Sequence, residues 1–163
     1  MSTSLSGATP HNTLPSTKDM RFAIVTARWN SHITYALRDA AVATLSKAGV
    51  ADDDIATFHV PGAVELTFAA SQLIETSQFD AVIVLGCVIR GGTPHFDYVC
   101  QSVTQGVTML NADCDVPVIF GVLTVDNEAD AIDRAGGRLG NKGAEAAEAA
   151  IMMADFARST KDM

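Results

Sequence analysis

Four short apolar runs alternate with longer segments of mixed character along this chain. The runs are rich in Val, Ile and Ala and show no polar alternation, which is typical of strands buried on both faces of a parallel sheet. We expect these strands at residues 21–27, 55–60, 81–85 and 117–123. Between them, apolar positions recur at the spacing of a helix face, as at Ile33, Leu37, Ala41 and Leu45. The predicted helices span residues 30–47, 63–76, 96–111 and 127–135, and a last helix begins near residue 143.

This regular alternation predicts an α/β fold with one parallel sheet, right-handed crossovers and helices on both faces. Residues 21–163 form a single predicted domain, because no internal repeat or change in composition divides them. Residues 1–20 are rich in Ser, Thr, Pro and Gly and are predicted to form a flexible N-terminal arm. A four-stranded sheet has two open edges that something must cover. We therefore expect an oligomer, in which the arm of a neighbouring subunit is one candidate cover.

The composition narrows the classes of function. Hydrophobic residues make up 48% of the chain and charged residues 18%, which excludes a disordered chain. The net charge is −8 and no basic patch is evident, so we expect neither nucleic acid nor an anionic membrane as a partner. No apolar run approaches the ~20 residues that span a bilayer. Residues 1–20 also lack the apolar core of a secretory signal, which predicts a cytoplasmic protein.

The chain has three cysteines, Cys87, Cys100 and Cys114, and their spacings match no zinc motif. An odd number without an export signal predicts reduced thiols, and no metal site is expected. Cys87 lies close to a loop that carries polar chemistry. A buried structural thiol is the preferred interpretation over a nucleophile, because the sequence assigns it no acid/base partner.

The most informative segment is LGCVIRGGTPHFDYV, residues 85–99. Its apolar strand is expected to end at Gly86, and a polar loop leads into the next helix. Loops at the carboxyl ends of strands are where open α/β folds bind ligands. Gly91 and Gly92 let main-chain amides approach an anion, the helix N-terminus adds partial positive charge, and His95 can move protons near neutral pH. The segment predicts a phosphate cradle with an acid/base group, although a lone histidine also has ordinary roles in capping and packing.

Other side chains that can bind a ligand or take part in catalysis follow the remaining strands. Trp29 comes after the first strand, where it either packs or stacks on a flat ring. Glu65 comes after the second, where it either complements the helix dipole or accepts hydrogen bonds from ligand hydroxyls. We expect these groups to converge at the carboxyl edge, together with Arg134 and Lys142 but without Phe120, which lies inside the fourth strand. The candidate cations for an anionic ligand are Arg90, Arg134, Arg138 and Lys142.

Five segments of the sequence, taken together and in order, match one known family. They are RWNSHIT (28–34), VPGAVEL (60–66), the central segment (85–99), PVIFGVLTVDNEADAIDRAG (117–136) and GNKGAEAA (140–147). In this order they resemble the lumazine synthases, which catalyse the penultimate step of riboflavin biosynthesis. The resemblance implies a three-layer flavodoxin-like sandwich. It also implies a transferase that condenses 5-amino-6-(D-ribitylamino)uracil with 3,4-dihydroxy-2-butanone 4-phosphate, releasing phosphate and water, without a metal or cofactor.

The resemblance also implies a role for each matching residue. His95 is the proton-transferring residue. The pyrimidine substrate contacts Trp29, Asn30, Ala63, Val64, Glu65, Cys87, Val88, Ile89, Phe120 and Lys142. The phosphate is bound by Gly92, Thr93 and Arg134. Trp29 stands where phenylalanine is common in the family and keeps the flat surface, whereas Val64 replaces a residue that is often aromatic.

The resemblance further implies a homo-oligomer with interfacial active sites, because the adjacent subunit supplies Phe120 and Arg134 in this family. A pentamer is the expected minimum. The short glycine-rich turn at residues 136–143 favours an icosahedral shell of 60 subunits, whereas Pro10 and Pro15 oppose the strand addition that would support it. Association with riboflavin synthase is a further implied partnership.

Two alternatives stay open at the level of the sequence. The first is a non-catalytic flavin-binding or shell protein that kept the fold and the pocket, against which the presence of His95, Thr93 and Arg134 argues. The second is a generic phosphate-binding module on a doubly wound sheet. Such a module has no need of Trp29, Glu65 and Phe120 together.

Overall fold

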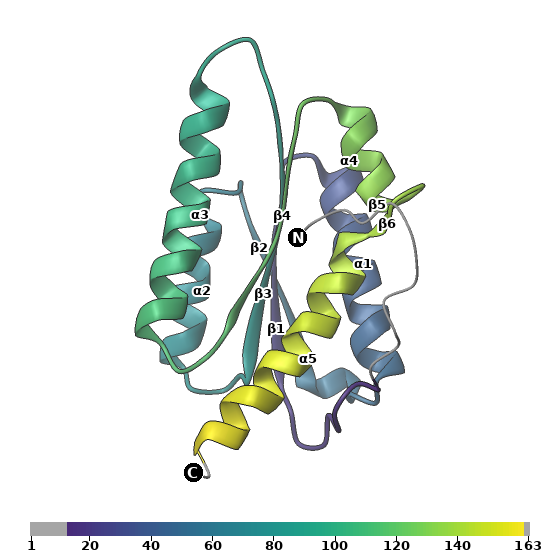
Figure 1. Cartoon of the computed structure of the whole chain (residues 1–163), viewed down its shortest axis with the longest axis vertical. Helices are drawn as coiled ribbons and strands as arrows, with labels where there is room; N and C mark the ends of the chain where they lie inside the picture. The colour runs from purple at the N-terminus through teal and green to yellow at the C-terminus, as the bar shows by residue number, and fades with distance from the viewer. Residues whose placement is uncertain (1–12, 162–163) are drawn as a thin grey trace.

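Strands and helices alternate along residues 13–161, the part of the chain that the computed structural model describes (Figure 1). The main strands are β1 (Phe22–Ala27), β2 (Ile55–Val60), β3 (Ala81–Ile89) and β4 (Val118–Val125). The helices are α1 (Ser31–Lys47), α2 (Leu66–Glu75), α3 (His95–Asp113), α4 (Glu128–Arg134) and α5 (Lys142–Lys161). A 3₁₀ turn, Asp52–Asp54, precedes β2, and a hairpin of β5 (Ala135–Gly137) and β6 (Gly140–Asn141) joins α4 to α5.

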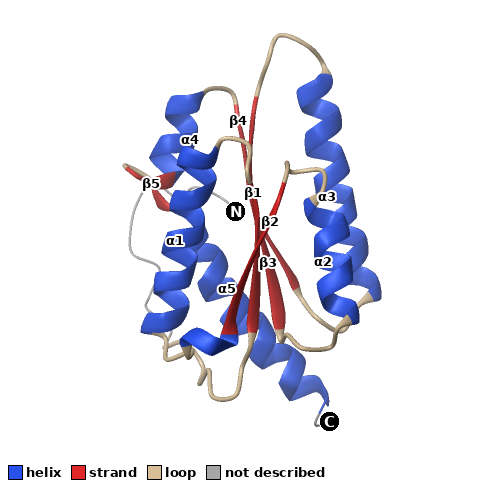
Figure 2. Cartoon of the chain, turned by 180° about the vertical axis from the view of Figure 1, so that it is seen from behind, coloured by secondary structure: helices blue, strands red, loops and turns tan. Residues whose placement is uncertain are grey.

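The four main strands form one parallel sheet in the order β2-β1-β3-β4. Figure 2 shows this sheet between two layers of helices. Because every strand runs the same way, all four carboxyl ends meet at one edge. The arrangement confirms the predicted flavodoxin-like α/β sandwich.

The two faces of the sheet bury separate hydrophobic clusters. Along β1, Phe22 and Ile24 join the cluster beneath α1, α4 and α5, whereas Ala23 and Val25 join the cluster beneath α2 and α3. Successive side chains of a strand point to opposite faces, so a strand covered on both sides is apolar throughout. This geometry explains the unbroken apolar runs in the sequence (Figure 1).

Helices α1 and α5 approach each other closely at Gly143. A Cβ atom at this position would overlap the main-chain carbonyl oxygen of Leu37, so only glycine permits the contact. The close approach seats α5 against the sheet and leaves Lys142, the first residue of α5, beside α1 and the hairpin.

Some predicted boundaries were wrong. The third strand was expected to end at Leu85, but β3 continues to Ile89 because Gly86–Ile89 stay paired with Val122–Val125 of β4. Helix α2 begins at Leu66 rather than at residue 63. The glycine-rich break after α4 is a small antiparallel hairpin.

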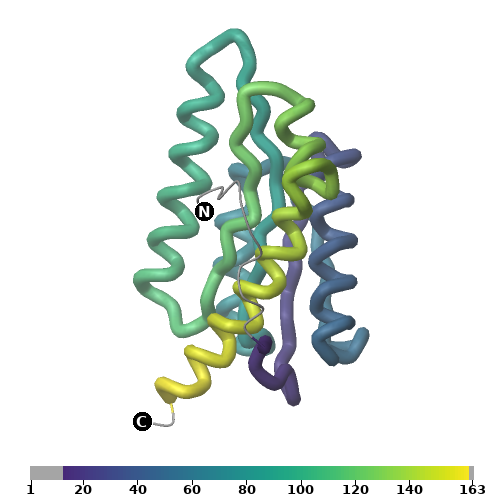
Figure 3. The backbone as a smooth tube through the Cα atoms, turned by 45° about the vertical axis from the view of Figure 1, so that its right-hand side comes forward, coloured from purple at the N-terminus to yellow at the C-terminus, as the bar shows by residue number. Residues whose placement is uncertain are grey.

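Residues 13–20 of the predicted arm lie against the domain, and residues 1–12 lie outside the described part of the chain. The hydroxyl of Thr17 donates a hydrogen bond to the carbonyl oxygen of Ala48 over 2.9 Å, and Met20 is buried. Arg158 of α5 donates hydrogen bonds to the carbonyl oxygens of Lys18 and Asp19. Figure 3 shows this purple segment beside the yellow helix α5. Within residues 13–161, no helix combines the length and the apolar character needed to cross a membrane.

Candidate active site

A cavity of about 400 Å³ lies at the carboxyl edge of the sheet, between the segments that follow β1, β2 and β3. Its lining residues are Ala27, Trp29, Asn30, Ala63, Val64, Glu65, Cys87, Val88, Ile89, Gly91, Thr93, His95, Phe96 and Val99. Most of the predicted site residues therefore meet in one place. Gly92 lies between two lining residues, whereas Phe120, Arg134 and Lys142 do not line the cavity.

A larger cavity of about 650 Å³ lies toward the other end of the sheet, beside β4 and α5. The side-chain amide of Asn111, one of its polar lining groups, is already bonded to the main chain of Val107 and Val118. Its described lining residues include no histidine, glutamate or tryptophan. The smaller cavity at the carboxyl edge, with its histidine, glutamate and tryptophan, is the better candidate for an active site.

The position of Trp29 is set by the segment after β2. Its main-chain N–H donates a hydrogen bond to the carbonyl oxygen of Pro61 over 3.1 Å. Its ring lies so close to Gly62 that a Cβ there would be 2.5 Å from Cε3. The N–H of Gly62 is in turn bonded to Oε2 of Glu65 over 2.9 Å. With 66% of its surface exposed, Trp29 offers a supported flat ring to a ligand.

Asn30 links the first site loop to the centre of the sheet. Its backbone is in the left-handed region, with φ at 57°, a conformation that asparagine tolerates better than most residues. Its side-chain Nδ2 donates a hydrogen bond to the carbonyl oxygen of Cys87 over 3.0 Å. The contact holds the loop that carries Trp29 against β3.

Cys87 is a buried thiol in the wall of the cavity. Only 6% of it is exposed, and burial, assisted by the negative charge of Glu128, raises its pKa to about 11. A thiol with this pKa is protonated at neutral pH and is a poor nucleophile. The structure therefore supports the interpretation of Cys87 as a structural residue.

The loop from Gly91 to His95 leaves room for a ligand. A Cβ at Gly91 or Gly92 would meet no atom within 4 Å, and neither residue has a positive φ. The fold of this chain alone therefore does not require glycine at these positions. His95 is the first residue of α3, is exposed and lines the cavity.

Three of the four candidate cations are paired with carboxylates at 3.2 Å or less. Arg90 donates hydrogen bonds to Asp126 and Asp97, and the bond to Asp126 is the main reason that its pKa is raised. Arg138 pairs with Asp133 at 2.7 Å, and Lys142 pairs with Glu145 at 2.8 Å. The hydrogen bond from Arg138 lowers the pKa of Asp133.

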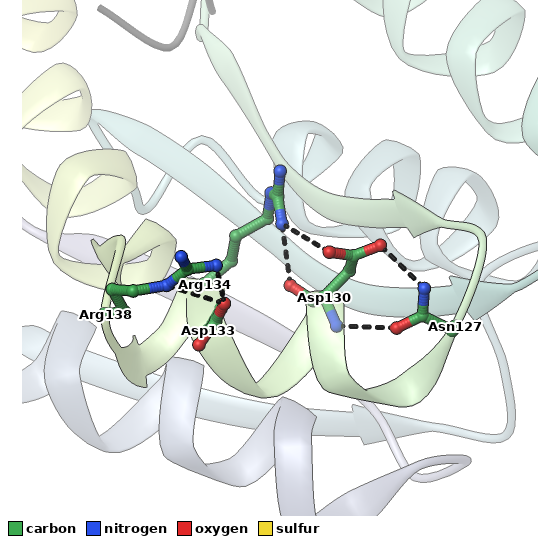
Figure 4. A network of polar contacts seen from close by, with 5 residues as sticks. All are labelled: Asn127, Asp130, Asp133, Arg134 and Arg138. Carbon is green, nitrogen blue, oxygen red and sulfur yellow. Dashed lines mark hydrogen bonds and ion pairs between the residues drawn. The ribbon is translucent and has the colours of Figure 1, made fainter. Parts of the chain in front are cut away.

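Arg134 is the cation with the weakest carboxylate contact (Figure 4). Helix α4 begins where Asn127 Oδ1 accepts a hydrogen bond from the N–H of Asp130, and it ends at Arg134. Arg134 Nη1 donates to the main-chain oxygen of Asp130 over 2.9 Å, and the Asp130 carboxylate lies 3.7 Å away. Much of its planar guanidinium is therefore left for another anion.

The expected convergence of Arg134 and Lys142 with the other site residues was wrong for a single chain. Arg134 lies at the end of α4 and Lys142 at the start of α5, both beyond β4, and neither reaches the cavity between the β1, β2 and β3 loops. Phe120 belongs to β4 and packs against the cluster beneath α2 and α3. Sequence reasoning also missed Ala27, Phe96 and Val99, which are apolar and carry no chemical signal.

The fold and the cavity define a flavodoxin-like α/β protein with a small-molecule site at the carboxyl edge of its sheet. A family model described as 6,7-dimethyl-8-ribityllumazine synthase matches residues 19–158. This chain belongs to that family of riboflavin biosynthesis enzymes, as the sequence segments predicted, and it is an enzyme of the transferase type.

Curated relatives agree with the family model. A 6,7-dimethyl-8-ribityllumazine synthase of Phocaeicola vulgatus is 52% identical over 145 residues, which cover 89% of this chain and 86% of that protein. The enzyme of the same name from Bacteroides fragilis is 56% identical over 137 residues, covering 84% of this chain and 96% of that protein. The enzyme of the same name from Parabacteroides distasonis is 55% identical over 145 residues, covering 89% of this chain and 91% of that protein.

Proposed function

We propose that this chain makes 6,7-dimethyl-8-ribityllumazine from 5-amino-6-(D-ribitylamino)uracil and 3,4-dihydroxy-2-butanone 4-phosphate, with release of phosphate and water. One observation carries the proposal: a single cavity joins the exposed ring of Trp29 to Glu65, Thr93 and His95. Trp29 offers a stacking surface and Glu65 a hydrogen-bond acceptor. Thr93 lies on the loop that binds the phosphate, and His95 carries protons. Each of these groups has a part in binding the two substrates or in the proton transfers of the condensation.

The pyrimidine substrate stacks on Trp29 in this proposal. Its ribityl chain and ring edge lie along Ala63, Val64 and Glu65, and Asn30 adjoins the stack. The main chain of Cys87, Val88 and Ile89 offers donors and acceptors to the pyrimidine edge. The ketone phosphate lies at Gly92 and Thr93, where the open space around the glycines supports a close approach of the anion.

The chemistry consists of proton transfers around a condensation. The amine attacks the ketone to form an imine, phosphate is eliminated, the resulting enol becomes a ketone, and the second nitrogen closes the ring. His95 moves protons between these groups as a general acid and base. Positioning of the two substrates supplies much of the remaining rate. No step in this sequence requires a metal or a redox cofactor.

An adjacent subunit completes each site in this proposal. Arg134, Phe120 and Lys142 lie away from the cavity of their own chain, which supports their supply to a neighbour's cavity. Apolar side chains exposed on the described surface support the same arrangement; among them are Phe68, Tyr98, Met109 and Phe156. We propose a homopentamer at least, and a 60-subunit shell as the larger assembly. Sedimentation velocity tests both, since a mass near one chain excludes either assembly and a mass near five chains excludes the shell.

Two further parts of the proposal rest on the family alone. We propose a cytoplasmic location and an association with riboflavin synthase. Co-sedimentation of the purified assembly with riboflavin synthase tests the association.

The test of the reaction is an absorbance assay with both substrates in the presence of a chelator. Product formation at a rate that chelation leaves unchanged supports the proposal.

His95→Ala should lower kcat by about 100-fold or less, because amine–ketone condensation is feasible without a catalyst. Arg134→Gln should raise KM for the ketone phosphate by roughly 10- to 150-fold, the value of a hydrogen bond to a charged group. Flavin binding without turnover would instead support the non-catalytic alternative.

A further inference from the structure

Arg90 connects three segments around the loop that carries His95. It follows the last residue of β3, and its main-chain N–H donates to the carbonyl oxygen of Val125 over 2.9 Å. Its Nε donates to Asp126 Oδ1, beyond the end of β4, over 2.8 Å. Its Nη1 donates to Asp97 Oδ1, in the first turn of α3, over 3.2 Å.

The flat face of the same guanidinium packs on an aromatic ring. The Cζ atom of Arg90 lies 4.1 Å from the centroid of the Phe96 ring. Phe96 is only 9% exposed and lines the candidate active-site cavity directly after His95. One side chain therefore fixes the end of β3, the end of β4 and the start of α3 relative to one another.

The loop between these fixed points has little support of its own. Among the described residues, Gly91, Gly92 and Thr93 make no hydrogen bond, and the two glycines have no neighbour within 4 Å of a built Cβ. The first contact after them is the hydrogen bond from the N–H of Asp97 to the carbonyl oxygen of Pro94, at 3.0 Å. The path of the loop is thus set mainly by its two ends.

We infer that Arg90 is a positioning residue that holds the 91–95 loop, and with it Thr93 and His95, at the mouth of the cavity. This inference rests on the proposed function, in which His95 transfers protons. It differs from the sequence-based expectation that Arg90 supplies positive charge to an anionic ligand. Two carboxylates occupy its Nε and Nη1 donors, so its charge is offset before any ligand arrives.

Arginine suits this position better than lysine. Its planar fork presents separate N–H donors to two carboxylates while its face stacks on a ring, and an ammonium group cannot do both. The three side chains are well exposed, at 46% for Arg90, 54% for Asp97 and 75% for Asp126. Exposed ion pairs of this kind add little to stability. The effect of Arg90 should therefore appear in the rate and in the motion of the loop.

The test is a double-mutant cycle with the proton carrier. Both substrates are used to measure kcat and KM for wild type, Arg90→Gln, His95→Ala and the double variant. Arg90→Gln alone should lower kcat by about 10- to 100-fold, the cost of a misplaced catalytic group. In the His95→Ala background the same change should lower kcat by less than about 2-fold, because the proton carrier is already absent and displacement of Thr93 acts on KM for the ketone phosphate. Equal effects in both backgrounds would overturn the inference.

Arg21→Gln is the matched control. Arg21 also pairs with a carboxylate, Asp54 at 3.5 Å, and packs over a ring, Phe79 at 5.7 Å, but it lies at the amino end of β1. Arg21→Gln should leave kcat unchanged both in wild type and in the His95→Ala variant. A loss of kcat as large as that of Arg90→Gln would show that the effect is general and would overturn the inference.

Hydrogen–deuterium exchange gives a readout that does not depend on turnover. The amide of Asp97, which is bonded to the carbonyl oxygen of Pro94, should exchange faster in Arg90→Gln than in wild type, and Arg21→Gln should leave its exchange as in wild type. If wild type makes no product from the two substrates, the proposed function fails and the loop exchange still decides whether Arg90 holds the loop. Unchanged exchange at the Asp97 amide in Arg90→Gln would overturn the inference.

Discussion

The side-chain amide of Asn30 donates a hydrogen bond to the main-chain carbonyl oxygen of Cys87 over 3.0 Å. The two residues are 57 positions apart in the chain. Asn30 reverses the backbone after β1 with a left-handed conformation, and the same residue ties the resulting loop to β3. Trp29 is thereby held beside the segment that is proposed to bind the edge of the pyrimidine.

Two substitutions of Asn30 separate its two contributions. Asn30→Gly removes the hydrogen bond but keeps the left-handed conformation accessible, and should lower the free energy of unfolding by about 1 kcal/mol. Asn30→Ala removes the bond and adds a left-handed strain of roughly 1 kcal/mol, for a total loss of about 2 kcal/mol. Urea unfolding at one protein concentration measures both. An alanine variant as stable as the glycine variant would show that the left-handed backbone at residue 30 adds no strain for alanine.

Gly62 is predicted to control the environment of Trp29. A methyl group at residue 62 would lie 2.5 Å from Cε3 of the ring, so Gly62→Ala must displace the indole. Trp29 is the only tryptophan in the chain, and its emission spectrum reports the displacement directly. Saturating quenching of this emission by riboflavin, a flat-ring ligand, should weaken in the same variant. Stacking on an aromatic ring is worth ~1–3 kcal/mol, which bounds the expected loss of affinity.

The matched control for that substitution is Gly91→Ala. A Cβ at Gly91 meets no atom within 4 Å, so the emission of Trp29 in the free protein should stay as in wild type. An identical spectral change in both variants would show that the indole is not held by Gly62.

The main strands were predictable because burial on both faces leaves an unambiguous apolar run. Strand β2 was predicted to the residue, since the sequence DDD precedes it and Pro61-Gly62 follows it. Strand β3 was predicted four residues short because Gly86 looks like a terminator in isolation. In the structure, Gly86 lies against Leu66 and Val122 and pairs within the sheet, and this context is tertiary. The hairpin of β5 and β6 is too short to produce a pattern.

The candidate site was predictable to the extent that parallel topology places successive strand ends at one edge. Trp29, Glu65 and His95 each follow a different strand, and they meet in the cavity. The pairing of Arg90 with Asp126 was not predictable, because 36 residues separate them and neither belongs to a periodic pattern. The distance of Arg134 from its own cavity also has no signal in a single sequence, because it depends on how α4 packs.

Two buried threonines should respond in opposite ways to the isosteric change to valine. Thr26 in β1 is fully buried, and its hydroxyl has no hydrogen-bond partner among the described residues. Thr26→Val should raise the free energy of unfolding by about 1 kcal/mol, because it removes an unpaired polar group from the core.

Thr34 in α1 is the matched control for Thr26. It is equally buried, but its hydroxyl donates to the carbonyl oxygen of Ala27 over 2.7 Å. Thr34→Val should therefore lower the free energy of unfolding by about 1 kcal/mol. Urea unfolding of the two variants measures the contrast, and a loss of stability in Thr26→Val would contradict the unpaired state of that hydroxyl.

The Cys87 thiol should make stability fall at alkaline pH. Burial raises its pKa from 9.0 to about 11, so between these values the folded chain keeps a proton that the unfolded chain has lost. Stability is therefore fully present below about pH 9 and declines as the pH rises toward 11. Between pH 8 and pH 10.5, wild type should lose about 2 kcal/mol more free energy of unfolding than Cys87→Ala, which has no thiol to ionise. Because every other titrating group is common to both proteins, equal losses in the two would show that the thiol ionises as readily in the folded chain as in the unfolded one.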